Sequence, residues 1–276
     1  MPELPEVEAV RRLLDRHLTH ARIARVELGR AGLRSPFPPQ FEARLIGRTV
    51  RSLMRRAKYL LATLSSGDTL IIHLGMSGSF RVEPPSAANR GESAEPDRHD
   101  HVVFHLDSGD RVTFNDPRRF GLMDLLGEEE LARHRVLSRL GHEPLSADFD
   151  ARALAEACRG RKTALKVALL DQRIAAGIGN IYACEALHLA RLSPFKRAST
   201  IATAGGAPRE AANRLADAIK RVLKRAIDRA ATASSSARFR VYDREGERCP
   251  RRGCGGRIRR RTQAGRSTFY CPTCQR

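Results

Sequence analysis

Four of the six cysteines lie in one C-terminal stretch, Cys249-Pro-Arg-Arg-Gly-Cys254, followed sixteen residues later by Cys271-Pro-Thr-Cys274. In a reducing compartment, two close cysteine pairs separated by roughly 15 to 20 residues are typical of a structural Zn²⁺ site rather than of disulfides. Four thiolates complete a closed tetrahedron around the ion, and the neighbouring glycines permit the tight turns of each knuckle. We therefore predict one structural Zn²⁺ per chain, held by Cys249, Cys254, Cys271 and Cys274.

The 276-residue chain is strongly basic, with 50 Lys and Arg against 31 Asp and Glu and a net charge of +19. Residues 238–276 hold twelve Arg, no Lys and three acidic residues, so +9 of this charge lies in the cysteine-rich segment. Such a charge is typical of proteins that bind a polyanion, with nucleic acid first among them. General solubility charge and an Arg-rich genome are the alternative explanations.

The sequence carries no evident membrane or export signal. No apolar run approaches the roughly 18 residues of a membrane span. The first residues, Met-Pro-Glu-Leu-Pro-Glu, are acidic, whereas a signal peptide begins with basic residues and an apolar run. We therefore expect a cytoplasmic protein without a membrane segment. Cys158 and Cys184, which stand apart from the other cysteines, are expected to be buried as small apolar residues.

Hydrophobic spacing predicts two further regions ahead of the cysteines. A helix is expected over 3–18, and strand-like runs follow from 22 to 125. Two hairpins are expected, in which turn residues separate the paired strands: Tyr59–Leu64 with Thr69–Leu74, and Val102–Leu106 with Arg111–Asn115. Residues 84–98 are expected to form an exposed loop. Helices are then expected at 128–140, 150–159, 163–171, 180–190 and 208–231. We expect an α+β multidomain chain with domains at 1–127, 128–233 and 238–276.

A helix–turn–helix pattern covers the segment from 160 to 190. Its turn reads Gly177-Ile-Gly-Asn180, where glycines let the backbone approach a phosphate and the following helix presents free N–H groups to it. Asn180 is the expected N-cap of that helix. An ordinary helical turn with a glycine C-cap explains the same residues equally well.

The N-terminus is a candidate for nucleophilic chemistry. A small second residue normally allows Met1 to be removed, which exposes Pro2 as a secondary amine with a pKa near the α-amino value of about 7.7–8. Such an amine is partly neutral at physiological pH and attacks electrophilic carbon to form an iminium. Glu3 and Glu6 lie beside it as candidate proton carriers. The alternative is structural, because Pro and Glu also favour the first turn of a helix.

Three loop-borne features suit a nucleic-acid surface. Lys58 follows two arginines and an alanine ahead of a strand. Met76 lies in a glycine-bracketed loop, and Arg118 and Phe120 lie in the turn Asn115–Gly121. Exposed Met, Arg and Phe side chains on loops of a basic protein fit wedges that unstack bases. The alternative is that Met76 and Phe120 fold back onto the core.

Several motifs together resemble the bacterial formamidopyrimidine-DNA glycosylases. They span the whole chain in that family's order: Met-Pro-Glu-Leu-Pro-Glu-Val-Glu at the N-terminus, Arg56–Leu60, His73–Gly78, Asn115–Gly121, Gly177–Tyr182 and Gly265–Cys274. The resemblance implies an N-terminal β-sandwich with a leading helix, a helical domain with a helix–two-turn–helix motif, and a C-terminal zinc finger with four cysteine ligands. It also implies a monomer that binds double-stranded DNA containing oxidised bases or abasic sites.

The family's activity implies a role for each matching residue. The enzyme would be a DNA glycosylase and abasic-site (AP) lyase of base-excision repair, removing 8-oxoguanine and formamidopyrimidines. Pro2 would attack C1′ and hold the sugar as a Schiff base, Glu3 would protonate the opening sugar ring, and Glu6 would assist. Lys58 would bind phosphate and serve in β-elimination, and Arg266 would assist δ-elimination. The matching DNA-contacting positions are His99, Arg118, Arg161, Lys166 and Asn180, with Met76, Arg118 and Phe120 filling the space left by the flipped base.

The chain departs from the family pattern in two places. The first cysteine pair has four intervening residues instead of the usual two, and the stretch between the last long helix and the finger is reduced to 232–237. An endonuclease VIII-like glycosylase for oxidised pyrimidines is the nearest alternative, although Leu4 and the Met-Arg-Phe set favour purines. A non-catalytic zinc-ribbon nucleic-acid binder is the alternative from another class, and it would leave the N-terminal residues without a role.

Overall fold

The computed structural model describes residues 1–29, 32–85, 97–231 and 239–276. Most of the loop expected at 84–98 and the whole of the short 232–237 stretch lie outside these ranges. The chain forms two compact units, Met1–Ser138 and Arg139–Arg276. Among the described helices, none combines the length and the apolar composition that a membrane crossing requires.

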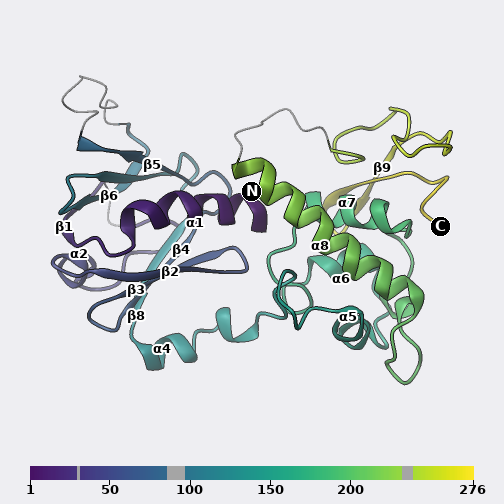
Figure 1. The fold of residues 1–276 in the computed structure, drawn as a ribbon, viewed down its shortest axis with the longest axis horizontal. Coiled ribbons are helices and arrows are strands. Elements are labelled where there is room, and N and C mark those ends of the chain that lie inside the picture. The colour runs from purple at the N-terminus through teal and green to yellow at the C-terminus, as the bar shows by residue number, and fades with distance from the viewer. Residues whose placement is uncertain (30–31, 86–96, 232–238) are drawn as a thin grey trace. The chain divides into compact units, whose positions relative to one another are not determined.

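The first unit contains two four-stranded antiparallel sheets (Figure 1). One sheet has the order β1 (Ile23–Leu28), β6 (Asp100–Leu106), β7 (Arg111–Asn115) and β5 (Ser79–Glu83). The other has the order β2 (Val50–Arg56), β3 (Tyr59–Leu64), β4 (Thr69–His73) and β8 (Leu122–Leu126). Both predicted hairpins are confirmed, because β3 pairs with β4 and β6 pairs with β7.

Helix α1 (Leu4–Leu18) runs between the two sheets in Figure 1 and contacts β2, β3 and β5. Its buried residues include Leu4, Val7, Leu14 and Leu18 at helical spacing, and the last three belong to the core cluster of the unit. In β3, Leu60, Ala62 and Leu64 are buried, the period of a strand with one face in a core. A short helix, α2 (Phe41–Leu45), contacts β1. Helix α1 is thus held against strands of both sheets.

The second unit is helical and ends in a two-stranded hairpin. Helix α7 (Asn180–Ala190) is buried along nearly its whole length and contacts α6 (Leu165–Leu170), α8 (Glu210–Ala231) and β10 (Arg266–Tyr270). Helix α5 (Ala151–Cys158) packs on α8, and β9 (Arg259–Gln263) pairs with β10. Cys158 and Cys184 are both buried, as predicted.

The prediction of one helix over 128–140 is wrong. Helix α4 covers only Glu128–Ala132, and a separate 3₁₀ turn covers Leu137–Arg139. Neither segment buries a residue. A short helix without an apolar face in a core is marginal in water, so propensity alone does not extend it.

Candidate functional site

The N-terminal residues begin α1 and are held in place by its cap. Glu3 is the N-cap and is 3% exposed, and Pro2 before it is partly exposed. The backbone N–H of Glu3 donates to Oε2 of Glu6 at 2.8 Å, and the Val7 N–H donates to the carbonyl of Glu3 at 3.0 Å. Glu6 therefore fixes the backbone that presents Pro2 and Glu3, which is a positioning contact.

Lys58 lies in the two-residue turn between β2 and β3. The turn needs a left-handed residue, Ala57 at φ +54°, and Lys58 beside it is 7% exposed. Arg55 binds this turn to α1: its Nη1 donates to the carbonyl of Ala57 at 3.0 Å, and its Nε donates to Oε2 of Glu8 at 3.2 Å. The turn that carries Lys58 is thus tied to the helix that begins just after Pro2.

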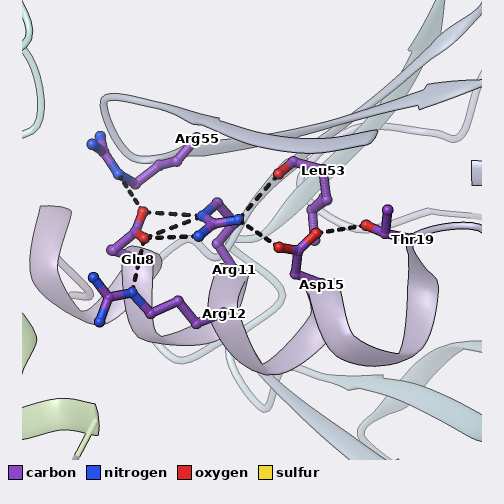
Figure 2. A network of polar contacts seen from close by, with 7 residues as sticks. All are labelled: Glu8, Arg11, Arg12, Asp15, Thr19, Leu53 and Arg55. Atoms are coloured by element: carbon purple, nitrogen blue, oxygen red, sulfur yellow. Dashed lines mark hydrogen bonds and ion pairs between the residues drawn. The ribbon is translucent and has the colours of Figure 1, made fainter. Parts of the chain in front are cut away.

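Glu8 is the centre of a polar network on α1 (Figure 2). Its carboxylate also accepts from Arg11 and from Arg12, each with a contact at 3.1 Å. Hydrogen bonds and charges from these arginines lower the pKa of Glu8 although burial acts to raise it. Glu8 was not predicted from the sequence, where it is one of three acidic residues among the first eight.

His73 ends β4 next to the Lys58 turn and was not predicted as a site residue. Its ring lies 4.7 Å from that of Tyr59, and its Nδ1 accepts from the Gly75 N–H at 3.0 Å. Burial, with the positive charges of Lys58 and Arg34, lowers its pKa to about 4. The ring is therefore neutral, with Nδ1 as acceptor toward the following loop.

Two loops of the first unit are joined by one buried carboxylate, Asp116. Its two oxygens accept from the Ser77 hydroxyl in the β4–β5 loop and from the Gly121 N–H at 2.7 Å in its own β7–β8 loop. Its backbone N–H donates to the carbonyl of His99 at 3.0 Å, and the Arg118 N–H donates to the Ser77 hydroxyl at 3.2 Å. The Asp-Pro turn signal marks this residue, but its partner loop cannot be read from the sequence.

The predicted wedge residues are on the surface of these joined loops. Met76 is 42% exposed and Phe120 is 43% exposed. The guanidinium carbon of Arg118 lies 4.9 Å from the centre of the Phe120 ring, a cation–π contact. Neither apolar side chain folds back onto the core, so the structural alternative for Met76 and Phe120 is not supported. His99 is partly exposed on the neighbouring segment.

In the second unit, the glycine turn is organised by Gln172. Its Oε1 accepts from the Gly177 N–H at 2.8 Å, and its Nε2 donates to the carbonyl of Ile178 at 2.9 Å. The prediction that Asn180 caps α7 is wrong, because Gly179 is the N-cap and Asn180 is the first helical residue. Its side chain instead faces the C-terminal hairpin, where Nδ2 donates to the carbonyl of Ser267 at 2.9 Å.

Lys166 meets the same hairpin from α6. It is 0% exposed, and its Nζ donates to the carbonyl of Ser267 at 3.0 Å and to the Thr268 hydroxyl at 2.8 Å. Its contact with DNA stays a prediction. In the structure its ammonium is buried against residues Ser267 and Thr268 of the hairpin. Lys166 and Asn180 thus converge on one carbonyl of β10.

Arg266 and Arg161 are accessible. Arg266 is exposed where β10 begins, directly after the turn residues Ala264 and Gly265 at φ +46° and +71°. Two left-handed residues in a two-residue loop match the twist of the hairpin. The side chain of Arg161 is 39% exposed, and its Nη1 lies 3.5 Å from a carboxylate oxygen of Asp171.

The four predicted ligands form one cluster, with all sulfurs within 4.8 Å of one another. Two pairs lie at 3.9 Å (Cys249 and Cys274) and 3.5 Å (Cys254 and Cys271). A tetrahedral Zn²⁺ with Zn–S bonds of about 2.3 Å separates its sulfurs by roughly 3.8 Å, so the cluster fits the ion. Four sulfur donors leave no position for a catalytic water, which makes the centre structural.

The finger is attached to α7 by a residue that sequence reasoning missed. Glu185 is 6% exposed, and its carboxylate accepts the backbone N–H groups of Arg240, Val241 and Tyr242 at 2.8 to 3.0 Å. Three backbone donors compensate the burial of this carboxylate. A Glu in the middle of an apolar helix was the available signal, but its partners lie more than fifty residues away.

Comparison with known proteins identifies each part of the chain. Residues 1–123 match the formamidopyrimidine-DNA glycosylase N-terminal domain. Residues 140–238 match the H2TH domain of the same enzymes, and 246–276 match the zinc finger found in FPG and IleRS. The class defined by this fold and these sites is therefore that of zinc-finger DNA glycosylases with a helix–two-turn–helix domain.

Full-length relatives define the family. Formamidopyrimidine-DNA glycosylases of Bradyrhizobium sp. (strain BTAi1) and Methylobacterium sp. (strain 4-46) are 53% and 54% identical, and the matches cover 100% of this chain and 100% and 99% of theirs. The Lactococcus lactis enzyme bound to abasic-site DNA matches over the full length of both chains, with 30% identity and a TM-score of 0.86. MutM bound to DNA containing carbocyclic 8-oxoguanine also matches over the full length of both chains, with 30% identity and a TM-score of 0.85. The chain belongs to the formamidopyrimidine-DNA glycosylase family.

Proposed function

We propose that this chain excises oxidised purines from double-stranded DNA, 8-oxoguanine and formamidopyrimidines among them, and then cleaves the strand at the abasic site. The observation that carries the proposal is the N-terminal turn, where Pro2 precedes a buried Glu3 whose backbone is fixed by Glu6. Solved relatives bound to abasic-site DNA and to 8-oxoguanine DNA support the same substrates. Members of this family are base-excision repair glycosylases with AP lyase activity.

The chemistry assigned to Pro2 begins once Met1 is removed. Its nitrogen attacks C1′, the bond from C1′ to the oxidised base breaks, and the base leaves. The proton of the amine passes to Glu3, which gives it to the ring oxygen as the sugar opens, and this leaves an iminium between Pro2 and C1′. The iminium acidifies the C2′ proton, and its loss expels the 3′ phosphate. Lys58 serves this β-elimination, and Arg266 assists the following δ-elimination of the 5′ phosphate.

The proposed DNA grip combines phosphate contacts with a base-stack wedge. His99, Arg161, Lys166 and Asn180 are assigned to DNA contact, the last two at the finger hairpin. Met76 and Phe120 enter the space of the extruded nucleotide, and Arg118 faces the orphaned base. Extrusion requires a few kcal/mol of unstacking and unpairing, which such wedges offset.

Zinc and the cellular setting complete the proposal. One Zn²⁺ per chain is bound by the four cysteines and stabilises the finger without taking part in the reaction. The chain acts as a cytoplasmic monomer divided into a catalytic part at 1–127, a DNA-binding helical part at 128–233 and a finger at 238–276.

Borohydride trapping tests the proposal. Reduction of the iminium should join wild-type protein covalently to an 8-oxoguanine duplex, and Pro2→Gly should reduce this product strongly, with mass spectrometry confirming loss of Met1. Preference for a thymine glycol duplex would favour the pyrimidine-specific alternative. Absence of any adduct with oxidised or abasic duplexes would leave only a nucleic-acid binder.

A further inference from the structure

The first cysteine knuckle is docked on the C-terminal turn of α7. Arg251, one of the four residues between Cys249 and Cys254, directs its Nη2 to the carbonyl of His188 and, at 3.4 Å, to that of Leu189. The last carbonyls of a helix lack intrahelical partners and carry partial negative charge, so a guanidinium there is favourable. The knuckle is therefore fixed by a contact that one of its four intervening residues provides.

His188 contacts the metal ligand itself. Its Nε2 lies 3.3 Å from Sγ of Cys249, and the side chain is 0% exposed. A zinc-bound thiolate has no proton, so the ring nitrogen must be the donor. Within the described part of the chain, Nδ1 of His188 has no hydrogen-bond partner, so the ring's polar contact is directed at the sulfur.

We propose that His188 and Arg251 form the outer shell of the zinc centre: His188 donates an N–H···S hydrogen bond to Cys249, and Arg251 anchors the knuckle to α7. The hydrogen bond withdraws charge from the thiolate and fixes its orientation. The anchor restrains a loop with four residues between its cysteines, whose closure costs more conformational entropy than that of a two-residue loop. Both are positioning residues. This inference rests on zinc occupancy of the cysteines and not on the glycosylase reaction.

Zinc transfer from the full-length, zinc-loaded protein to a chromogenic chelator tests the role of His188. His188→Leu keeps an apolar side chain of similar size but removes the donor, and we expect zinc affinity to fall about 10- to 100-fold, as for other outer-shell partners. His188→Gln returns an N–H at the end of the side chain and should restore most of the affinity. His142→Leu, at an exposed histidine of the same unit, is the control.

A matched pair of neighbouring residues tests Arg251. Arg251→Gln should speed zinc transfer, whereas Arg252→Gln, which removes an equal charge from an exposed position of the same knuckle, should not. Equal effects would mean that net positive charge, and not the helix contact, holds the knuckle, and would overturn the assignment of Arg251.

Cobalt substitution gives a readout that simple loss of stability does not move. Removing a hydrogen bond from a thiolate raises the energy of its lone pairs, so the sulfur-to-cobalt charge-transfer band of His188→Leu should shift to longer wavelength, and that of His188→Gln should not. A folded His188→Leu protein with wild-type affinity and spectrum would overturn the proposal. Wild-type protein isolated without zinc would overturn it together with the zinc assignment, while borohydride trapping reports separately on the glycosylase.

Discussion

Glu3 and Glu6 form the start of a helix and are also the residues assigned to proton transfer in the proposed reaction. Glu6 accepts the Glu3 N–H at 2.8 Å, as a capping residue does, and this contact also orients the backbone beside Pro2. The sequence offered a helix start and a nucleophile as alternatives. The structure shows that the helix start is real, and that it is compatible with the proposed chemistry because the cap leaves Pro2 outside the helix.

Arg55→Gln tests whether the turn that carries Lys58 must be tied to α1. The variant loses the Glu8 contact and changes the support of the Ala57 carbonyl. Since a displacement of about 1 Å can reduce a rate about 100-fold, we expect single-turnover β-elimination on a preformed abasic duplex to fall about 10- to 100-fold at saturating enzyme. Arg12→Gln removes an exposed partner of the same Glu8 carboxylate and should leave the rate nearly unchanged. Equal rates for the two variants would contradict this role of Arg55.

The low pKa of His73 predicts that the stability of the first unit decreases in acid. Its pKa is about 4 in the folded protein against 6.5 for an ordinary histidine, so between these values the unfolded chain binds more protons. Stability therefore falls as the pH decreases from about 6.5 to 4, by at most about 3 kcal/mol from this group. The stability advantage of wild type over His73→Gln in urea unfolding should shrink across this range. Parallel pH profiles for the two proteins would contradict the assignment.

The β4–β5 and β7–β8 loops meet backbone to backbone at Gly75. A Cβ there would lie 2.3 Å from the carbonyl carbon of Phe120, and the residue has φ +63°. We expect Gly75→Ala to destabilise the protein by about 2–5 kcal/mol, from left-handed strain plus overlap. Gly67→Ala has φ +91° but nothing within 4 Å, so it should show only the strain of about 1–2 kcal/mol. Thermal unfolding of the two variants separates these contributions, and similar losses would show that the contact is unimportant.

Elements with strong periodicity could be predicted, and those decided by tertiary contacts could not. The hairpins of β3 with β4 and of β6 with β7 follow from alternating residues around Gly-Asp turns. The failure at 128–140 arose because helix-forming residues there have no core to cover. Asn180 was misassigned because a local rule for caps competed with a partner, Ser267, that lies eighty-seven residues away.

At the scale of the molecule, the charge of +19 predicts salt-dependent DNA binding. Each phosphate neutralised contributes a slope of about −0.9 to log K against log salt concentration. Arg266→Ala should weaken binding uniformly across sequences and reduce the magnitude of the slope by about one. Arg257→Ala, at another exposed arginine of the finger, is the matched control and should keep the wild-type slope. An unchanged slope for Arg266→Ala would exclude a phosphate contact.

The cysteine ligands could be predicted from spacing, but the attachment of the finger could not. Contacts reach the finger from both ends and the middle of α7, through Asn180, Glu185 and His188. Each is a polar residue in a helix whose other faces are apolar, and each partner is remote in sequence. The finger is thus built onto the helical unit, and its folding does not depend on zinc alone.

The carboxylate of Asp116 has a consequence for the timing of lesion recognition. Because it binds both loops, and because their backbones approach closely at Gly75, we expect Met76 and Phe120 to move together. For the proposed wedge, we therefore expect entry into the base stack as a single event, observed as one kinetic phase with a fluorescent base analogue rather than two. The same would hold on undamaged DNA. At a normal base pair, Met76 and Phe120 would either both insert or both stay outside the stack.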